Sequence, residues 1–272
     1  MGNGRVKIKR YKTRRSGKGW LFLLVILLLG GIGAAYGRTE NFQRLLISPA
    51  PTLSPGESQL DARTVVLAGK TWYALQLGAF ENEESARELA ESFRARGAGS
   101  LVEHRGNYRV LAAAYESRAD AQTVQQQLRS QHGVEAYICE ISRSEITLKI
   151  SGQKAQLTAL TDAYDALAQA ELQLSALSQG LDRGETGKEA ALAALRSQRD
   201  TLLALRSRLS SLFGENAHAA VTQVMQLLSA LESGISSALD MKEILPLGAQ
   251  IKYCQLLVIT GLVTYGEGLA IL

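Results

Sequence analysis

The side chains of this chain that could do catalytic chemistry are few and scattered. His104, His132 and His218 lie far from one another and from the two cysteines, Cys139 and Cys254. The close pairs of ligands that are typical of a zinc site are therefore absent from the sequence. Two buried thiols are favoured over a disulfide, because the predicted positions of the cysteines give no geometric support for pairing.

Two further patterns also lack the spacing that catalysis needs. The Gly-Lys pair before Glu189 resembles the end of a phosphate-binding loop, but Asp182 occupies the position of the first glycine and Glu189 that of the magnesium-binding hydroxyl. Glu83 and Glu84 are adjacent, and adjacent residues do not face one another on a helix. The sequence therefore predicts a protein that is not an enzyme and that uses no metal or other cofactor.

Two polar side chains suit binding better than catalysis. Gln76 alternates with Leu75 and Leu77, so it points away from the side that these two leucines bury. Arg109 lies within the predicted strand at 108–115, and alternation turns it outward as well. An amide both donates and accepts hydrogen bonds, and a guanidinium is a planar donor for hydroxyl and carboxylate groups, so both side chains suit a sugar ligand.

Each of these residues also has a purely structural interpretation. Gln76 could satisfy the backbone of a bulged strand, since Gly78 favours a bulge. Arg109 could pair with Glu103 across a hairpin, an interaction that contributes little when it is exposed to solvent. The sequence leaves both alternatives open.

The elements that must position these residues alternate between strand and helix over 71–141. Strands are predicted at 72–77, 100–104, 108–115 and 135–141. Helices are predicted to begin after Asn82 and Ser117 and to end near Gly97 and Gly133. This βαββαβ order is the split-βαβ plan of ferredoxin-like and RNP-like α+β domains, in which two helices cover one face of an antiparallel sheet and leave the other face open.

Residues 71–141 resemble the SPOR (sporulation-related) domain family. The resemblance rests on Tyr73-Ala-Leu-Gln76-Leu-Gly78-Ala79-Phe80, which contains a Gln-x-Gly-x-Phe signature, and on Tyr108-Arg109-Val110 in the third strand. The resemblance implies a module that binds peptidoglycan through the open sheet face and prefers glycan strands stripped of their peptide stems. The glycan-binding residues that it implies are Gln76, Gly78, Ala79, Asn107, Arg109 and Ile138.

The match departs from the family pattern at two of these positions. Ala79 stands where members often carry serine, and Asn107 stands where an aromatic residue often precedes the arginine. On the fourth strand Tyr137 and Ile138 point to opposite faces, and alternation alone does not show which one is exposed. Ile138 is the one included in the predicted site.

The N-terminal region predicts a membrane anchor. Residues 1–18 contain eight Lys and Arg and no acidic residue, and 19–37 contain no charge. A helix of that length spans about 28 Å, close to the thickness of a bilayer core, and the basic flank predicts a cytoplasmic N-terminus. The alternatives are a cleaved signal peptide or, with less support, a nucleic-acid-binding tail. The membrane anchor and the cleaved signal peptide both export the rest of the chain.

The remaining regions are a linker and a helical domain. Three of the four prolines lie within 38–70, which predicts an extended tether. Residues 150–272 have helical periodicity with short breaks at 180–187 and 213–216, which predicts an antiparallel bundle. The uncharged stretch 253–266 is too short to cross a membrane and is best interpreted as a fourth packing helix or a segment covered by a partner.

Composition agrees with this organisation. The chain has 272 residues and a net charge of +4, and this excess comes from the basic tail. The sequence predicts a non-catalytic single-pass membrane protein that binds peptidoglycan glycan strands at the septal wall during division or sporulation. Its other predicted partners are the membrane and division or sporulation proteins that contact the helical region, but not nucleic acid. The alternatives are a cell-wall glycan hydrolase targeted by the SPOR domain, and a coupling protein whose SPOR face binds protein.

Overall fold

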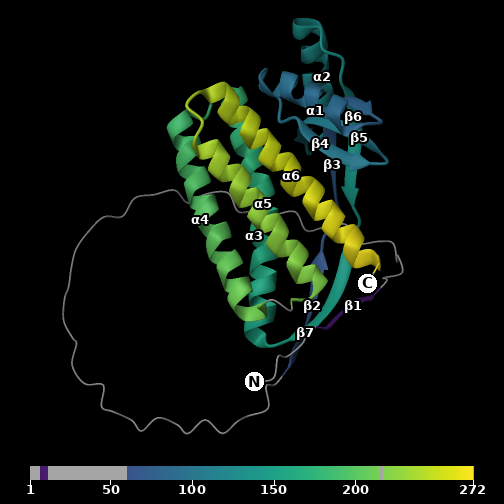
Figure 1. The fold of residues 1–272 in the computed structure, drawn as a ribbon, viewed down its shortest axis with the longest axis vertical. Helices are drawn as coiled ribbons and strands as arrows, with labels where there is room; N and C mark the ends of the chain where they lie inside the picture. Colours follow the sequence, from purple (N-terminus) through teal and green to yellow (C-terminus); the bar gives the residue numbers. More distant parts are fainter. Residues whose placement is uncertain (1–6, 12–59, 215–216, 272) are drawn as a thin grey trace, which may run out of the picture. The chain divides into compact units, whose positions relative to one another are not determined.

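The structure, a computed structural model, describes residues 7–11, 60–214 and 217–271 (Figure 1). The predicted membrane segment at 19–37 and most of the predicted linker lie outside these residues. All described elements belong to one unit of the chain.

The segment with the predicted βαββαβ order forms a four-stranded antiparallel sheet with two helices. Its strand order is β4-β5-β3-β6, and the predicted order of elements is confirmed. The bounds are β3 Lys70–Phe80, α1 Glu83–Arg94, β4 Leu101–Arg105, β5 Asn107–Tyr115, α2 Arg118–His132 and β6 Tyr137–Arg143.

The two helices begin and end where the sequence chemistry places them. The Asn82 side chain accepts a hydrogen bond from the Ser85 amide at 2.8 Å, and Ser117 caps α2 in the same way. Helix α2 ends at Gly133, whose φ of 62° is the left-handed conformation that glycine adopts without strain. These caps fix the positions at which the chain enters and leaves the sheet.

A second, three-stranded sheet was not predicted. It has the order β1-β7-β2, with β1 at Lys7–Tyr11, β2 at Asp61–Leu67 and β7 at Ile146–Gly152. Residues 61–67, within the predicted linker at 38–70, and residues 7–11, within the predicted tail at 1–18, are therefore strands in the structure. Both strands lie at the edges of this sheet and owe their strand form to pairing with β7, a long-range interaction that local composition does not reveal.

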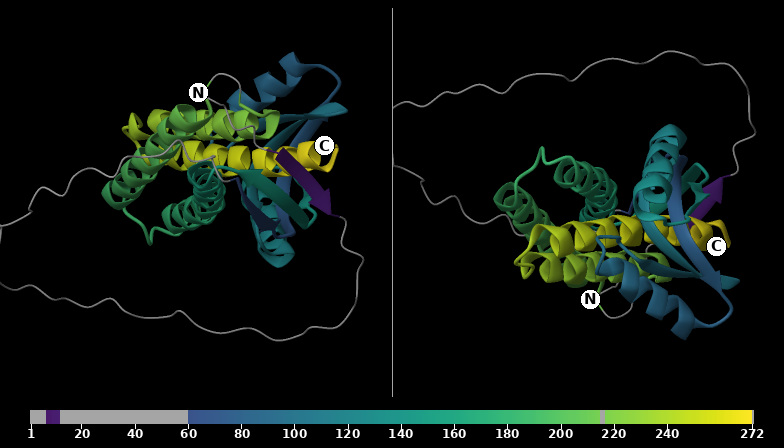
Figure 2. Two further views of the ribbon diagram at one scale, coloured as in Figure 1. Left: turned by 90° about the horizontal axis from the view of Figure 1, so that it is seen from below. Right: turned by 90° about the horizontal axis from the view of Figure 1, so that it is seen from above.

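Four long helices follow the second sheet. They are α3 Lys154–Asp182, α4 Lys188–Phe213, α5 Ala219–Leu239 and α6 Ile244–Ile271. The predicted helical region is confirmed, and the C-terminal stretch is a fourth helix rather than a segment that awaits a partner. Figure 2 shows α6 (yellow) alongside α5 and next to the strands of the four-stranded sheet.

Helix α6 is apolar on two sides because it belongs to two cores. One stripe packs into the bundle core and contains Leu247, Ile251, Cys254, Val258, Leu262 and Tyr265. The other stripe packs on the four-stranded sheet and contains Leu256, Ile259 and Val263. A helix that is apolar on all sides is typical of a buried position, which explains why this segment lacks a clear amphipathic pattern.

The sheet face that was predicted to be open is therefore partly covered. Helices α1 and α2 cover one face, as predicted, and α6 covers much of the other. The sheet residues buried under α6 are Trp72, Ala74, Leu101, Leu111, Ala114 and Ile141. The prediction of an open face is wrong for this part of the sheet, because the chain supplies its own helix to bury these side chains.

Three polar interactions tie the sheet to the helices. Glu171 of α3 is only 2% exposed and accepts hydrogen bonds from the Trp72 indole nitrogen at 3.0 Å and from Lys70 Nζ at 2.5 Å. The Gln255 amide nitrogen of α6 donates to the Ala114 carbonyl at 3.0 Å. Buried polar groups are costly unless they are paired, so these contacts favour one arrangement of helix and sheet.

Among the described residues, one stretch is long and apolar enough to cross a bilayer. It covers Ile244–Gly268 in α6, and two-thirds of its most apolar window is buried against the rest of the protein. The core of a water-soluble protein passes the same test, so we interpret α6 from its packing.

The packing of α6 on the sheet predicts a specific loss of stability. Leu256→Ala removes a fully buried side chain between α6 and the sheet, and it should lower the free energy of unfolding by about 2–5 kcal/mol. Leu172→Ala, at an exposed position on α3, should change it by less than about 0.5 kcal/mol. Chemical denaturation of the two variants measures the difference, and equal values would show that α6 does not pack on the sheet.

Candidate functional site

One end of the sheet face remains uncovered beyond α6. Gln76 on β3 lies opposite Tyr137 on β6, and Ala79 on β3 lies opposite Arg109 on β5. Directly opposed residues in an antiparallel sheet share a face, and the bulge between Gln76 and Gly78 brings Ala79 to the face of Gln76, so these four side chains lie on one surface. Tyr137 is 66% exposed and Ala79 is exposed, whereas Gln76 and Arg109 are partly covered. We call these four residues the uncovered strip.

Two irregularities in strand pairing shape this end of the sheet. The register passes from Leu75 opposite Ala113 to Gln76 opposite Leu111, and then to Gly78 opposite Val110. The bulge that was considered as an alternative for Gln76 is therefore present. Gln76 nevertheless keeps the face of Trp72 and Ala74, as the alternation of the strand predicts.

Gly78 lies on the opposite face, under α1. A Cβ atom at this position would lie 3.0 Å from the Leu89 side chain and from the Phe80 ring. Its predicted place on the glycan face is wrong, because the bulge turns it toward the helix. The absence of a side chain at Gly78 serves the close packing of α1 on the sheet.

Ile138 is also placed wrongly by the prediction. It lies opposite Leu75 and packs with the cluster under α2, so its side chain points away from the strip. Its neighbour Tyr137 lies on the strip side of the sheet instead, opposite Gln76. The sequence could not decide between them, because the phase of the fourth strand depends on its register with β3.

Arg109 is paired rather than free. Its guanidinium donates from Nη2 to Glu103 Oε2 on the adjacent strand, and the two side chains are 19% and 10% exposed. Arg105 donates to the other oxygen of Glu103 at 3.1 Å and also reaches Glu267 of α6 at 2.9 Å. The structural alternative for Arg109 is thus present in the structure, and this carboxylate neutralises part of its positive charge.

Asn107 and Ala79 lie at the outer end of the strip. Asn107 is exposed and follows Gly106, which adopts a φ of 75° in the tight β4–β5 turn. Neither residue offers an aromatic surface. Tyr137 is the exposed aromatic side chain beside Gln76, and sequence reasoning did not assign it to the site.

Both cysteines are free thiols; Cys254 is buried, as predicted, whereas Cys139 is only half-buried. Cys139 lies opposite Ala74 on the strip side of the sheet, and burial raises its pKa more than the nearby charge of Arg109 lowers it. Burial raises the pKa of Cys254 in α6 to about 12. Both thiols are therefore protonated at neutral pH and weakly nucleophilic.

The described residues contain no group of three or more His, Cys, Asp or Glu side chains that could hold a metal ion. The strip offers an amide, an aromatic ring and a partly neutralised guanidinium on one face of the sheet. Such groups suit hydrogen bonding and ring packing with a polar, extended ligand.

Comparison with known proteins identifies the segment that carries this surface. The sequence model of the SPOR domain family matches residues 69–140. Residues 69–140 are a SPOR domain. SPOR domains are generally peptidoglycan-binding modules. Helices α3 to α6 lie outside the match, and no curated protein and no solved structure matches the chain with significance.

The Glu103–Arg109 pair predicts different costs for two substitutions in the strip. Arg109→Ala leaves the Glu103 carboxylate with one partner fewer in a largely buried position, so stability should fall by about 1–3 kcal/mol. Gln76→Ala breaks no such pair and should change stability by less than about 0.5 kcal/mol. Urea denaturation tests both. Equal effects would contradict the structural role of Arg109 and would make it as suitable as Gln76 for testing ligand contact.

Proposed function

We propose that this protein binds the glycan strands of peptidoglycan through the uncovered strip of its SPOR domain. The observation that carries the proposal is the side-by-side position of Gln76 and Tyr137 on the exposed end of the sheet face. The Gln76 amide supplies a donor and an acceptor for sugar hydroxyls. The Tyr137 ring supplies an apolar surface for the C–H groups of a sugar ring.

The position of α6 limits how a glycan strand reaches this face. The residues under α6 are inaccessible while the helix stays in place, since Trp72 and Leu111 are at most 1% exposed. A glycan strand therefore contacts the outer end of the sheet, across β3 and β6. Tyr137 supplies an aromatic ring on this face from β6, whereas the aromatic residue missing at position 107 belongs to β5.

In this proposal the protein is non-catalytic and acts by localisation. A preference for glycan strands without peptide stems would direct it to septal wall, in division or in sporulation. The exposed surface of α3 to α5 would then contact proteins of the same process. Support for this role comes from the SPOR domain and from its attachment to a helical bundle.

The packing of α6 on the sheet supports a second candidate function, that of a coupling protein. The apolar part of the SPOR sheet face is already covered by a helix of the same chain, because α6 packs on it. A coupling protein that uses this face to hold its helical domain in a fixed position would need no glycan contact. None of the described contacts favours the remaining alternative, a glycan hydrolase.

Co-sedimentation with purified sacculi separates the two candidates. The full chain should pellet with amidase-treated sacculi more than with untreated sacculi. Gln76→Ala and Tyr137→Ala should each weaken this binding about tenfold, the effect of losing roughly 1.4 kcal/mol of contact energy.

Gln126→Ala is the matched control, because it changes an exposed glutamine on α2, away from the strip. It should pellet as the wild type does. Absence of pelleting by the folded wild type, or equal pelleting of all variants, would reject the glycan proposal and favour the coupling role.

We further propose that the SPOR domain lies outside the cytoplasmic membrane and that 19–37 anchors it there, with the N-terminus in the cytoplasm. The location of peptidoglycan and the apolar character of 19–37 support this topology. One observation does not fit it. Strand β1 pairs with β7, and a membrane crossing at 19–37 would place these two strands on opposite sides.

A pair of introduced cysteines distinguishes the anchored topology from one in which β1 and β7 lie on the same side of the membrane. Lys9 and Lys149 are directly opposed in the β1–β7 pairing, so Lys9→Cys with Lys149→Cys reports their contact in a chain without the native thiols. The anchored topology predicts no disulfide in cells and no labelling of position 9 by an impermeant maleimide. A disulfide between positions 9 and 149 would show that both strands lie on one side of the membrane.

A further inference from the structure

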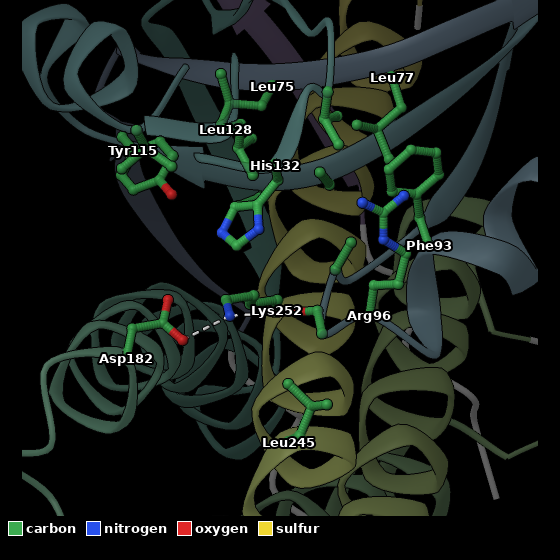
Figure 3. Close-up of a pocket in the computed structure, with 16 residues that line it drawn as sticks. Leu75, Leu77, Phe93, Arg96, Tyr115, Leu128, His132, Asp182, Leu245 and Lys252 are labelled. Atoms are coloured by element: carbon green, nitrogen blue, oxygen red, sulfur yellow. Dashed lines mark hydrogen bonds and ion pairs between the residues drawn. The ribbon is translucent and has the colours of Figure 1, made fainter. Parts of the chain in front are cut away.

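The face of the SPOR sheet opposite the strip contains a cavity of about 380 Å³ (Figure 3). It exists because α1 and α2 do not form one continuous core with the sheet. Ala86, Ala90 and Val110 form a cluster under α1, and Leu75, Ala121 and Ala136 belong to a separate cluster under α2. The sheet between the two clusters is the floor of the cavity.

The floor and walls of the cavity are apolar. Ala112 and Ala113 on β5 have side chains too small to fill the space between the helices. Phe93 of α1 and Leu128 of α2 form the walls. Leu245, at the first turn of α6, is 55% exposed and extends the apolar lining to the mouth of the cavity. The volume lies within the range of roughly 300–1,000 Å³ that is typical of small-molecule sites.

Basic side chains surround this apolar space. Arg96 in the turn after α1, His132 at the end of α2 and Lys252 of α6 line the cavity together (Figure 3). The acidic lining residue, Asp182 of α3, is already paired with Lys252 at 2.7 Å. Lys252 also donates to the Gly97 carbonyl at 3.2 Å. Arg96 carries the lining charge that no carboxylate pairs with in the described residues.

Tyr115 adds a hydrogen-bond donor to the lining. Burial, and then the charges of Asp182 and Asp120, raise the pKa of its phenol, so it stays protonated. The cavity thus combines an apolar floor with a neutral donor and an unpaired cation. An anionic group at Arg96 and His132 would complement this charge, and an attached apolar chain would fill the floor.

We infer that this cavity binds a small amphiphile with one alkyl chain and one anionic group, the chain over Ala112 and Ala113 and the anion at Arg96 and His132. The site lies on the other face of the sheet from the strip, so it does not depend on glycan binding. Fatty acids and single-chain phosphate esters share this chemistry.

Titration calorimetry on the purified full chain tests the site with soluble probes. Octanoate represents the fatty acids, with a carboxylate group, and octyl phosphate represents the single-chain phosphate esters. Octyltrimethylammonium carries the chain with the opposite charge, and acetate carries the anion without the chain. Saturable 1:1 binding of one or both anionic octyl probes, and at least tenfold weaker binding of the other two, is the expected result.

Two substitutions separate the contributions of charge and shape. Arg96→Gln should weaken binding of the anionic probes about tenfold, and Ala113→Leu, which fills the floor, should abolish it. Arg129→Gln is the control, because this α2 arginine is 74% exposed and pairs with Glu135 outside the cavity. It should bind as the wild type does. If Ala113→Leu fails to fold, Leu128→Trp fills the same space from the helix wall.

Equal binding of the cationic and anionic octyl probes would overturn the inference, as would binding that both space-filling variants leave unchanged. Absence of binding by the folded wild type would also overturn it. Co-sedimentation of Ala113→Leu with sacculi should match the wild type, so failure of the cavity proposal and failure of the glycan proposal give different results.

Discussion

Helix α6 packs one stripe of apolar side chains into the helical bundle and a second stripe onto the SPOR sheet. Each stripe alone would make an ordinary amphipathic helix. Together they join two cores through one element, so the sheet cannot move relative to the bundle without exposing Leu256, Ile259 and Val263 to water. This packing determines how much of the sheet face stays free. It also positions Leu245 and Lys252 of α6 in the lining of the cavity on the other face.

Polar contacts give the packed helices and sheet a defined orientation. Apolar stripes tolerate sliding, but the buried Glu171 carboxylate must keep both Trp72 and Lys70 to offset its desolvation. Lys70 in turn also pairs with Glu116 at 2.6 Å, and these two carboxylates raise its pKa even though burial acts in the opposite direction. Gly99 contributes by its small size, since a Cβ there would lie 2.8 Å from the backbone of α6.

Much of the domain could be predicted from the sequence because its signals are local. Caps at Asn82 and Ser117, a left-handed glycine at 133 and the alternation of Gln76 with Leu75 and Leu77 define the βαββαβ order and the outward face. The sequence could not reveal what depends on distant pairing. Which of Tyr137 and Ile138 faces the strip depends on the register of β6 against β3. The segments 7–11 and 61–67 form strands because they pair with β7.

The covered face is the most informative departure from prediction. The stretch 253–266 contains no charge and is apolar on two sides, and this pattern indicates that the segment is buried without showing which elements cover it. Only the three-dimensional arrangement reveals that its second side lies on the SPOR sheet. A SPOR domain joined to such a helix retains the strip residues Gln76 and Tyr137 on its free surface, while its apolar middle is buried.

Trp72 reports directly on whether α6 stays in place when glycan binds. It is 1% exposed under α6, and the chain contains two tryptophans, so Trp20→Phe leaves Trp72 as the sole indole fluorophore. Acrylamide quenching should be compared with and without soluble glycan chains that lack peptide stems, at concentrations that saturate binding. We expect weak quenching that the glycan does not change. Strong quenching of Trp72 in the bound state would contradict it, because glycan would then displace α6 and occupy the whole sheet face.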